Sequence, residues 1–245
     1  AHREPTRSDF TDRYMFAADD SYPKPERLMD IEAGYTYTAP RITAAINLYY
    51  MLYHNQLVAT GLVNDGDDAL NTNVERSFRR GVELMVAWQA TKWLTLSANA
   101  TLSENKIRDY VDLIKDSPTY GEELGDMTIS YSPSVVGSLI ADLHIKRFSA
   151  VWHTQYVGKQ YFTNNQTEAL SLDAYCVTNL NLGYTLQCKT RGDVRFGVAI
   201  NNLFSTLYES NGYGYSYMWE GERYDCAYYF PQAPINVLAN VTVTF

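Results

Sequence analysis

The histidines and cysteines of this 245-residue chain are the first candidates for catalysis or metal binding. The histidines are scattered, and neither a His-x-x-x-His pair nor a Ser-His-Asp arrangement occurs. The spacing of the cysteines matches no zinc motif, and their odd number leaves at least one of them unpaired. We therefore expect neither enzymatic activity nor a cofactor. The residues concerned are His2, His54, His144, His153, Cys176, Cys188 and Cys226.

A short acidic cluster suggests a calcium-binding loop. It consists of Asp65, Asp67 and Asp68. A complete calcium loop supplies a longer series of oxygen ligands, and that series is missing here. Solvated loop charge is the favoured interpretation, so the sequence predicts no metal site.

A tyrosine- and glycine-rich loop, roughly Tyr208 to Tyr228, is the best candidate for a ligand site. Aromatic rings that alternate with glycine can stack on a flat ligand or on a sugar. Alternatively, these rings belong to an aromatic belt at a membrane interface or pack the loop upon itself. The candidate residues are Tyr213, Tyr215, Tyr217, Trp219, Glu220, Arg223 and Tyr224.

The overall composition excludes two classes of protein. The net charge of −8 argues against nucleic-acid binding, which needs a basic surface. No apolar run reaches 18 residues, so a membrane-spanning helix is excluded, whereas the weaker signal of a membrane barrel is not. The 21 tyrosines and 4 tryptophans outnumber the 9 phenylalanines, which suits a surface with one wet and one dry end.

The elements that carry these residues are predicted to be β-strands. The stretch from Ile235 to Phe245 places apolar residues at every second position, which indicates a strand with one apolar face. Similar alternation predicts about nine long strands and no helix. Short turns and long polar loops join these strands alternately, as in outer-membrane barrels with short periplasmic turns and long extracellular loops. Residues 1–26 and the stretch from His54 to Thr72 are expected to be two of the long loops. The clearest segments are 31–39, 42–50, 82–88, 94–102, 148–156, 176–184 and 194–200.

The polar faces of these strands carry small side chains, such as Gly34, Asn47 and Ser97. A barrel of about eight strands has an interior that side chains can fill, and these are too small to fill it. We therefore expect a wider barrel with water or another domain inside, and strands missing upstream. Arg80 falls on the apolar face by parity and is expected at the outer rim, where a charge costs about 0–1 kcal/mol instead of about 2–4 at the bilayer centre.

Four motifs give the chain a family resemblance. Lys24-Pro25-Glu26 stands before the strand with Glu32 and Gly34. Arg80-Gly81-Val82-Glu83 and Asn201-Asn202-Leu203-Phe204, the latter followed by Tyr208, come later in the chain. The terminal Phe245 is similar to the aromatic end that outer-membrane barrels present to their assembly machinery. In this order and spacing, the motifs make nearly the whole chain resemble the C-terminal half of a TonB-dependent outer-membrane receptor.

The resemblance implies a 22-stranded antiparallel transmembrane β-barrel, of which this all-β chain supplies about 9–10 strands. Residues 1–245 are then a single barrel segment without the plug domain. The resemblance also implies the outer membrane of a Gram-negative bacterium, contact with its lipid, and import of a scarce nutrient such as an iron chelate, cobalamin or a glycan. Energy would come from the TonB complex through the missing plug. The family's residues that couple to TonB lie in the missing parts, so the resemblance assigns none of them to this chain.

Two other interpretations remain open at this stage. One is a complete small outer-membrane barrel that acts as a porin or adhesin, which needs an even number of strands. The other is a soluble β-domain that binds glycans through its tyrosine-rich loop. A disulfide between Cys176 and Cys226 is also open, because both are expected toward the outer side, where disulfides are permitted.

Overall fold

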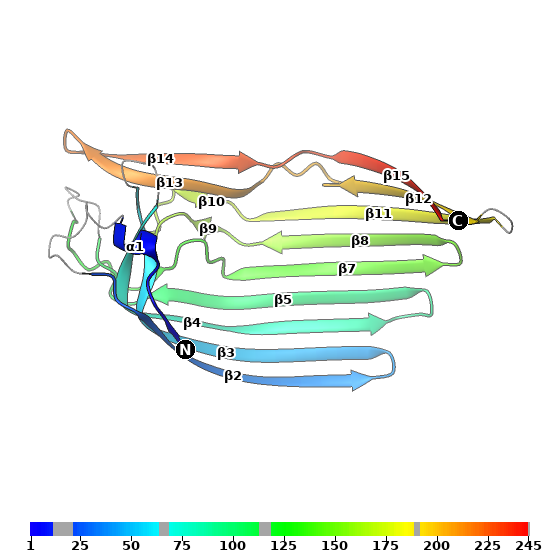
Figure 1. Cartoon of the computed structure of the whole chain (residues 1–245), viewed down its shortest axis with the longest axis horizontal. Coiled ribbons are helices and arrows are strands. Elements are labelled where there is room, and N and C mark those ends of the chain that lie inside the picture. The colour runs from blue at the N-terminus through cyan, green and yellow to red at the C-terminus, as the bar shows by residue number, and fades with distance from the viewer. Residues whose placement is uncertain (12–21, 64–68, 113–118, 189–191, 245) are drawn as a thin grey trace.

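The computed structural model describes residues 1–11, 22–63, 69–112, 119–188 and 192–244. Figure 1 shows a broad, curved antiparallel sheet whose long strands lie side by side. Nine long strands form it, as the sequence predicted. They are β2 (Glu26–Ala39), β3 (Ile42–Val63), β4 (Ala69–Gln89), β5 (Leu94–Ile107), β7 (Val135–Ile145), β8 (Phe148–Val157), β11 (Tyr175–Cys188), β12 (Gly192–Asn201) and β15 (Asn236–Thr244).

Each long strand pairs antiparallel with the next one, so that the order in space follows the order in sequence. Two short strands join the sheet at the end with the long loops: β1 (His2–Arg3) pairs with β2, and β6 (Met127–Thr128) pairs with β5. Within the described residues, β2 and β15 are not paired with each other. The sheet is therefore open, with β2 and β15 near its two edges.

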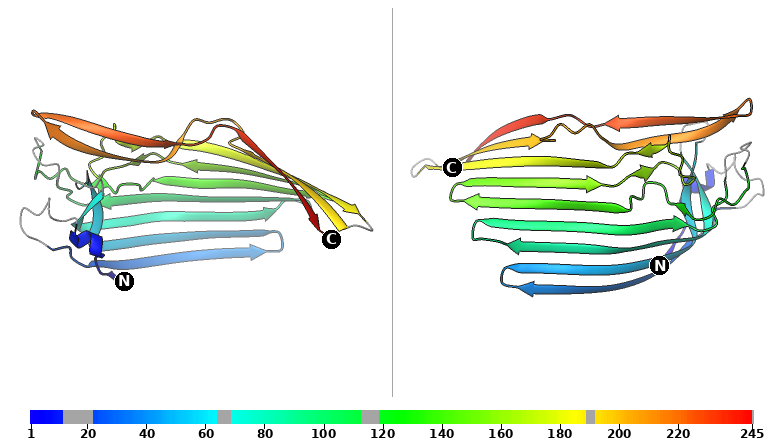
Figure 2. Two further views of the ribbon diagram at one scale, coloured as in Figure 1. Left: turned by 45° about the horizontal axis from the view of Figure 1, so that its top comes forward. Right: turned by 180° about the vertical axis from the view of Figure 1, so that it is seen from behind.

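The strand register confirms the predicted alternation. One row across the sheet pairs Ile46 with Leu84 and Leu84 with Ala100, while the next row pairs Asn47 with Glu83 and Glu83 with Thr101. Side chains of neighbouring strands therefore agree on which face they occupy. Figure 2 shows a single layer, and large apolar side chains such as Leu48, Leu139 and Val237 are exposed on one face.

The opposite, polar face brings small side chains close together. Asn99 Nδ2 donates a hydrogen bond to Ser138 Oγ at 2.8 Å across β5 and β7. At Gly183 a Cβ atom would lie 2.5 Å from Ser149 Oγ, so a larger residue there would displace the serine hydroxyl. In the described part of the chain, no second layer covers this face.

The connections differ at the two ends of the strands, as predicted. Short turns at residues 40–41, 90–93 and 146–147 lie at one end of the sheet in Figure 1, and the long connections lie at the other end. Of the described residues, no helix has the length and apolar character needed to cross a membrane.

Three segments expected to be loops contain regular structure. The predicted loop from His54 to Thr72 is mostly strand, because β3 and β4 extend to 22 and 21 residues. The predicted tyrosine-rich loop is a hairpin of β13 (Glu209–Trp219) and β14 (Glu222–Pro231). Its turn has Glu220 and Gly221 at φ of 51° and 81°, which suits a tight two-residue hairpin turn. The first 26 residues, expected to be irregular, contain β1 and the short helix α1 (Arg7–Thr11).

The apolar cores lie at the end of the sheet that carries the long connections. One cluster of buried side chains joins the extensions of β3 and β4 to the end of β5 and the segment after it: Val58, Val74, Ile107, Tyr110 and Ile129. Burial raises the pKa of the Tyr110 phenol above its usual range. The long connections at this end are therefore packed against one another.

Two sequence predictions fall on residues outside the described ranges. They are the acidic cluster Asp65, Asp67 and Asp68, and the terminal Phe245. Both remain predictions.

The two faces of β4 can test the expectation that the apolar face of the sheet contacts lipid. Leu84 is 43% exposed on the apolar face, and its neighbour Met85 is 52% exposed on the polar face. We expect Leu84→Arg to lower the free energy of unfolding by about 2–4 kcal/mol in a phospholipid bilayer. Met85→Arg, the matched control, should change it by about 0.5 kcal/mol or less. Guanidinium unfolding of the intact protein in vesicles measures both, and equal losses would contradict this assignment of the faces.

Candidate functional site

The β13–β14 hairpin presents a ladder of aromatic rings on one face. Cross-strand pairing places Tyr213 opposite Tyr228 and Tyr217 opposite Tyr224. The ring centroids of the first pair are 4.8 Å apart and nearly parallel, and those of the second are 5.5 Å apart. Tyr215 lies between them, 6.4 Å from both Tyr217 and Tyr228. We call these five tyrosines the tyrosine face.

The opposite face of the hairpin is attached to the segment between β8 and β11, which contains β9 (Gln160–Tyr161) and β10 (Ser171–Leu172). A Cβ atom on Gly212 would lie 2.7 Å from Phe162 Cζ, and one on Gly214 would lie 2.8 Å from Leu170 Cδ2. The glycines between the tyrosines therefore allow close packing against Phe162 and Leu170, both of which are buried. Alternation of tyrosine with glycine separates an exposed aromatic face from a docked one.

Arg223 lies on the docked face and apart from the tyrosine face. Its guanidinium donates hydrogen bonds to Asp225 Oδ1 at 2.9 Å, to Ser216 Oγ at 3.1 Å and to Thr167 Oγ1 at 2.5 Å. Ser216 Oγ also donates to Asp225 Oδ1 at 2.5 Å. These contacts tie the hairpin to the β8–β11 connection, so Arg223 positions the hairpin.

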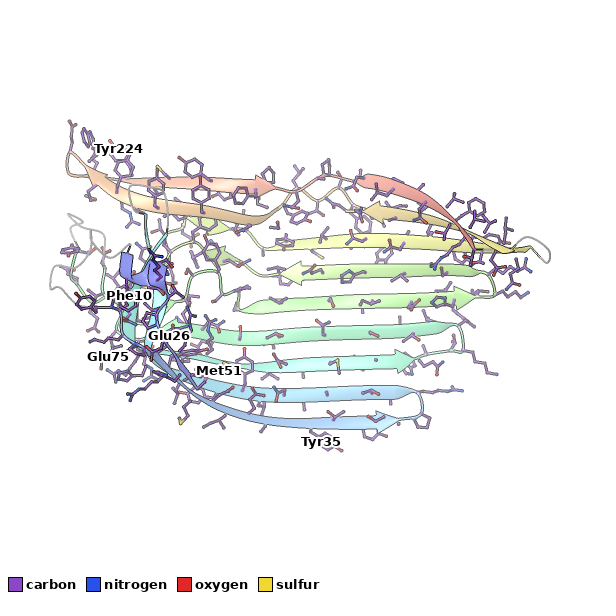
Figure 3. All side chains as sticks on the ribbon, viewed as in Figure 1. Phe10, Glu26, Tyr35, Met51, Glu75 and Tyr224 are labelled. Carbon is purple, nitrogen blue, oxygen red and sulfur yellow. The ribbon has the colours of Figure 1, made fainter. Side chains whose placement is uncertain are left out.

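The structure thus divides the residues singled out from the sequence. It brings Tyr213, Tyr215, Tyr217 and Tyr224 together on one face, and it adds Tyr228, which the sequence argument treated only as a boundary of the loop. Trp219 is on the same face near the turn and is 62% exposed. Figure 3 shows Tyr224 at the far tip of the hairpin. Arg223 and the turn residue Glu220 are not part of the tyrosine face.

Two phenols of the tyrosine face, those of Tyr215 and Tyr228, interact with each other. A hydrogen bond with Tyr228 raises the pKa of Tyr215 to about 12. Tyr215 therefore keeps its proton at neutral pH and remains a neutral ring. Cys226, opposite Tyr215, is a free thiol, and so is Cys176, so the structure contains no disulfide between these two residues.

A buried amide in the β8–β11 connection links several of the long connections. Asn164 is fully buried, and its side chain donates to the Ala59 carbonyl of β3 and accepts from the Ser130 amide at 2.8 Å. Next to it, the Tyr131 hydroxyl donates to the Gly212 carbonyl of β13 at 3.0 Å. One segment therefore holds the β3 extension, the β5–β7 connection and the hairpin together.

A second polar group lies on the inner face of the sheet. The Asn47 amide nitrogen is 3.5 Å from Glu32 Oε2 and 3.3 Å from Glu83 Oε2. Of the described residues, none forms an ion pair with either carboxylate. Beside them, Arg79 donates to Ser132 Oγ at 3.1 Å and to Asn105 Oδ1 at 3.4 Å. These residues line a hollow of about 430 Å³.

The sequence motifs contained Glu32 and Glu83 but did not identify this pair as a site. The alternation of side chains along each strand places both residues on the polar face, and this is the only indication of the pair that the sequence contains. Their juxtaposition depends on the register of β2, β3 and β4, which places Asn47 between them. In the described part of the chain, no group of three or more His, Cys, Asp or Glu side chains is arranged to hold a metal ion.

Docking of the hairpin on glycine can be tested with one substitution. A valine at position 214 would bring its Cβ within 2.8 Å of both the Cys226 carbonyl oxygen and Leu170 Cδ2. We expect Gly214→Val to cost about 1–3 kcal/mol and to release the hairpin. Amide hydrogen exchange in β13 should become faster. Tyr213→Ala, on the opposite face, is the control, and unchanged exchange in Gly214→Val would rule out this packing role.

Comparisons with known proteins agree with this architecture. The sequence matches the family described as TonB dependent receptor-like, beta-barrel, over residues 3–203. Among solved structures, the chain is similar to the ferric yersiniabactin uptake receptor FyuA from Yersinia pestis, with a TM-score of 0.62 and 18% identity. That match covers 91% of this chain and 31% of the receptor.

Two further solved structures show the same likeness. The copper transporter OprC matches with a TM-score of 0.67 and 16% identity, over 100% of this chain and 36% of the transporter. The ferric preacinetobactin receptor BauA from Acinetobacter baumannii matches with a TM-score of 0.59 and 16% identity, over 89% of this chain and 29% of the receptor. The chain spans about a third of the length of these proteins. The sequence match shows that the chain belongs to the TonB-dependent receptor-like β-barrel family, and its antiparallel sheet agrees with this.

Proposed function

We propose that this chain is the C-terminal part of the barrel of a TonB-dependent receptor in the outer membrane of a Gram-negative bacterium. The receptor imports a scarce nutrient, such as an iron chelate, cobalamin or a glycan. The observation that carries the proposal is the single-layer sheet with an uncovered apolar face. On β2 this face runs from Ile31 to Ala39, nine residues, and a membrane-spanning strand needs about 9–11.

The similar structures support import of a metal complex. FyuA is a receptor for ferric yersiniabactin, BauA is a receptor for ferric preacinetobactin, and OprC is a copper transporter. Identities of 16–18% establish only a shared fold, so the nutrient of this chain is part of the proposal.

The open sheet favours a larger barrel over the two other interpretations. A complete small barrel needs β2 to pair with β15, and these strands stay apart in the structure. A soluble domain needs a second layer over Leu48, Leu139 and Val237, all of which are exposed. Both edges can instead pair with further strands of a wide barrel, which removes unpaired backbone groups from the membrane.

The inner carboxylates support a plug domain inside the barrel. Glu32 and Glu83 point to the same side as Asn47, and no cation of the described residues lies within ion-pair distance of either carboxylate. An arginine from a plug could form charge-assisted hydrogen bonds with both carboxylates. We infer that this part of the sheet holds the plug through which the TonB complex supplies energy.

The tyrosine face is the proposed capture surface for the nutrient. Four of its five rings are exposed, its two cross-strand pairs are nearly parallel, and the hairpin that carries them is docked. A flat aromatic chelator or a sugar ring can stack on such rings, with Trp219 as an additional contact near the tip. Because the rings are already in place, binding orders few side chains.

Uptake experiments test the function and the capture surface together. A panel of ferric chelates, cobalamin and oligosaccharides identifies the nutrient in cells that express the intact receptor. Its uptake should stop in cells that lack TonB. Tyr213→Ala and Tyr228→Ala should each weaken binding about 3- to 10-fold, because an aromatic contact contributes about 0.5–1.5 kcal/mol.

Tyr35→Ala is the matched control, since Tyr35 is exposed on the apolar face of the sheet. It should bind the nutrient as well as the unmodified receptor does. Uptake that persists without TonB would refute the proposed transport mechanism. Normal affinity in both tyrosine variants would refute the capture surface alone.

The inner carboxylates make a separate prediction. Replacing both Glu32 and Glu83 with glutamine should weaken retention of the plug by about 1–3 kcal/mol, because hydrogen bonds to charged groups contribute in this range. The urea concentration at which the plug becomes accessible to protease should fall. Glu122→Gln with Glu123→Gln removes the same charge from a long connection and serves as control. If both double variants release the plug at the same urea concentration, the inner carboxylates do not hold it.

A further inference from the structure

A row of basic side chains crosses the outer face of the sheet, just beyond the apolar band and toward the long connections. The register pairs Arg27 with His54 and His54 with Arg76. Arg108 extends this row, because its amide donates to the Arg76 carbonyl at 3.0 Å. The row spans β2, β3, β4 and the residue after β5, about 14 Å at about 4.8 Å per strand. We call these four residues the basic row.

The next row toward the membrane is mostly apolar and includes Lys106, which lies opposite Phe78. Phe78 lies opposite Leu52, which lies opposite Met29. Phe78 is only 5% exposed, although no second layer covers the sheet. The guanidinium carbons of Arg80 and Arg108 lie 5.3 Å from the centre of its ring, one from each neighbouring row. These cation–π contacts cover the ring and orient both arginines at the surface.

Acidic residues neutralise only part of this charge. Arg80 is paired with Glu104 at 2.5 Å, and Arg76 lies 3.4 Å from Asp109. In the described part of the chain, Arg27 and Arg108 have no carboxylate partner. His2, which pairs with Arg27 at the edge of the row, contacts Glu4. Excess positive charge at this place contrasts with a net charge of −8 for the chain.

Two hollows lie on this outer face. The first, of about 470 Å³, lies between the basic row and the apolar residues below it, with Met29, Leu52 and Tyr50 in its lining. The second, of about 570 Å³, lies farther toward the short turns. There Ala44, Ala98 and Ala100 leave space beside larger neighbours. The rows of Arg80 and Ala100 are four residues apart along the strands, about 13 Å.

We propose that this surface binds a lipid that carries phosphate on its headgroup. Arg27, Arg76 and Arg108 contact the phosphate, and the acyl chains lie along the apolar face as far as the alanine-lined hollow. Arginine forks match phosphate oxygens in geometry, and a cluster of basic residues at a membrane interface attracts anionic headgroups. The apolar hollows favour a lipid over free phosphate. This inference rests on the proposed outer-membrane location but not on transport.

The test uses the intact receptor, purified in an uncharged detergent and stripped of lipid. Bisphosphorylated lipid A, dephosphorylated lipid A and inorganic pyrophosphate serve as probes, and binding is measured by native mass spectrometry. We expect the phosphorylated lipid to bind at least about tenfold more tightly than the other two, since hydrogen bonds to charged groups act together with apolar burial. Comparable binding of both lipids by the unmodified receptor would overturn the proposal.

Substitutions locate the site. The triple variant Arg27→Gln, Arg76→Gln, Arg108→Gln should bind phosphorylated lipid A at least about tenfold more weakly. Arg41→Gln, Lys146→Gln, Arg147→Gln removes the same charge at the short turns and should bind normally. Equal losses in both variants would overturn the location.

The readout also separates this inference from the proposed function. Lipid selectivity in a receptor that imports no nutrient would reject transport and support the lipid site. TonB-dependent import without lipid selectivity would support transport and reject the lipid site.

Discussion

The structure depends on a sheet that is one layer thick and therefore has a different surrounding on each face. Apolar side chains predominate on one face of the long strands and polar ones on the other, and the register keeps neighbouring strands in agreement. In water, exposed rows such as Leu48, Leu139 and Val237 would lose the stabilisation that burial gives. Lipid on one face and water on the other suit this arrangement, while the backbone ladder satisfies the polar groups of the strands.

The same constraint explains where packed cores occur. Within the sheet, small inner side chains and close cross-strand contacts leave little apolar area to bury. Beyond the apolar band, the long connections have water on all sides and must form cores of their own. They do so in two clusters, one around Ile107 and Tyr110 and one around Phe162 and Leu170. The long connections thus behave as a small packed structure on top of the sheet.

Much of the sheet was predictable because a period of two identifies a strand and its faces without knowledge of its neighbours. The same signal fails where polar or glycine residues alternate with aromatic ones, so the β13–β14 hairpin was interpreted as a loop. Once a segment is assumed to be a loop, parity cannot separate Arg223 from Tyr224, although they point to opposite faces. Glu32 and Glu83 show the other limit, because strand register sets their relative position, and a single strand carries no information about it.

The attachment of the tyrosine face determines what a ligand bound at this proposed site would do to the long connections. The hairpin contacts the β8–β11 connection through Gly212, Gly214 and Arg223, and it contacts the β5–β7 connection through Tyr131. The β8–β11 connection also binds β3 through Asn164. A nutrient that moves the hairpin must therefore repack Phe162 and Leu170, and such a change would reach the β3 extension through the same segment. Close-packed interiors respond to such a change by moving between discrete packing arrangements more readily than by deforming gradually. Binding on the tyrosine face can therefore leave the hairpin in place or rearrange several long connections together.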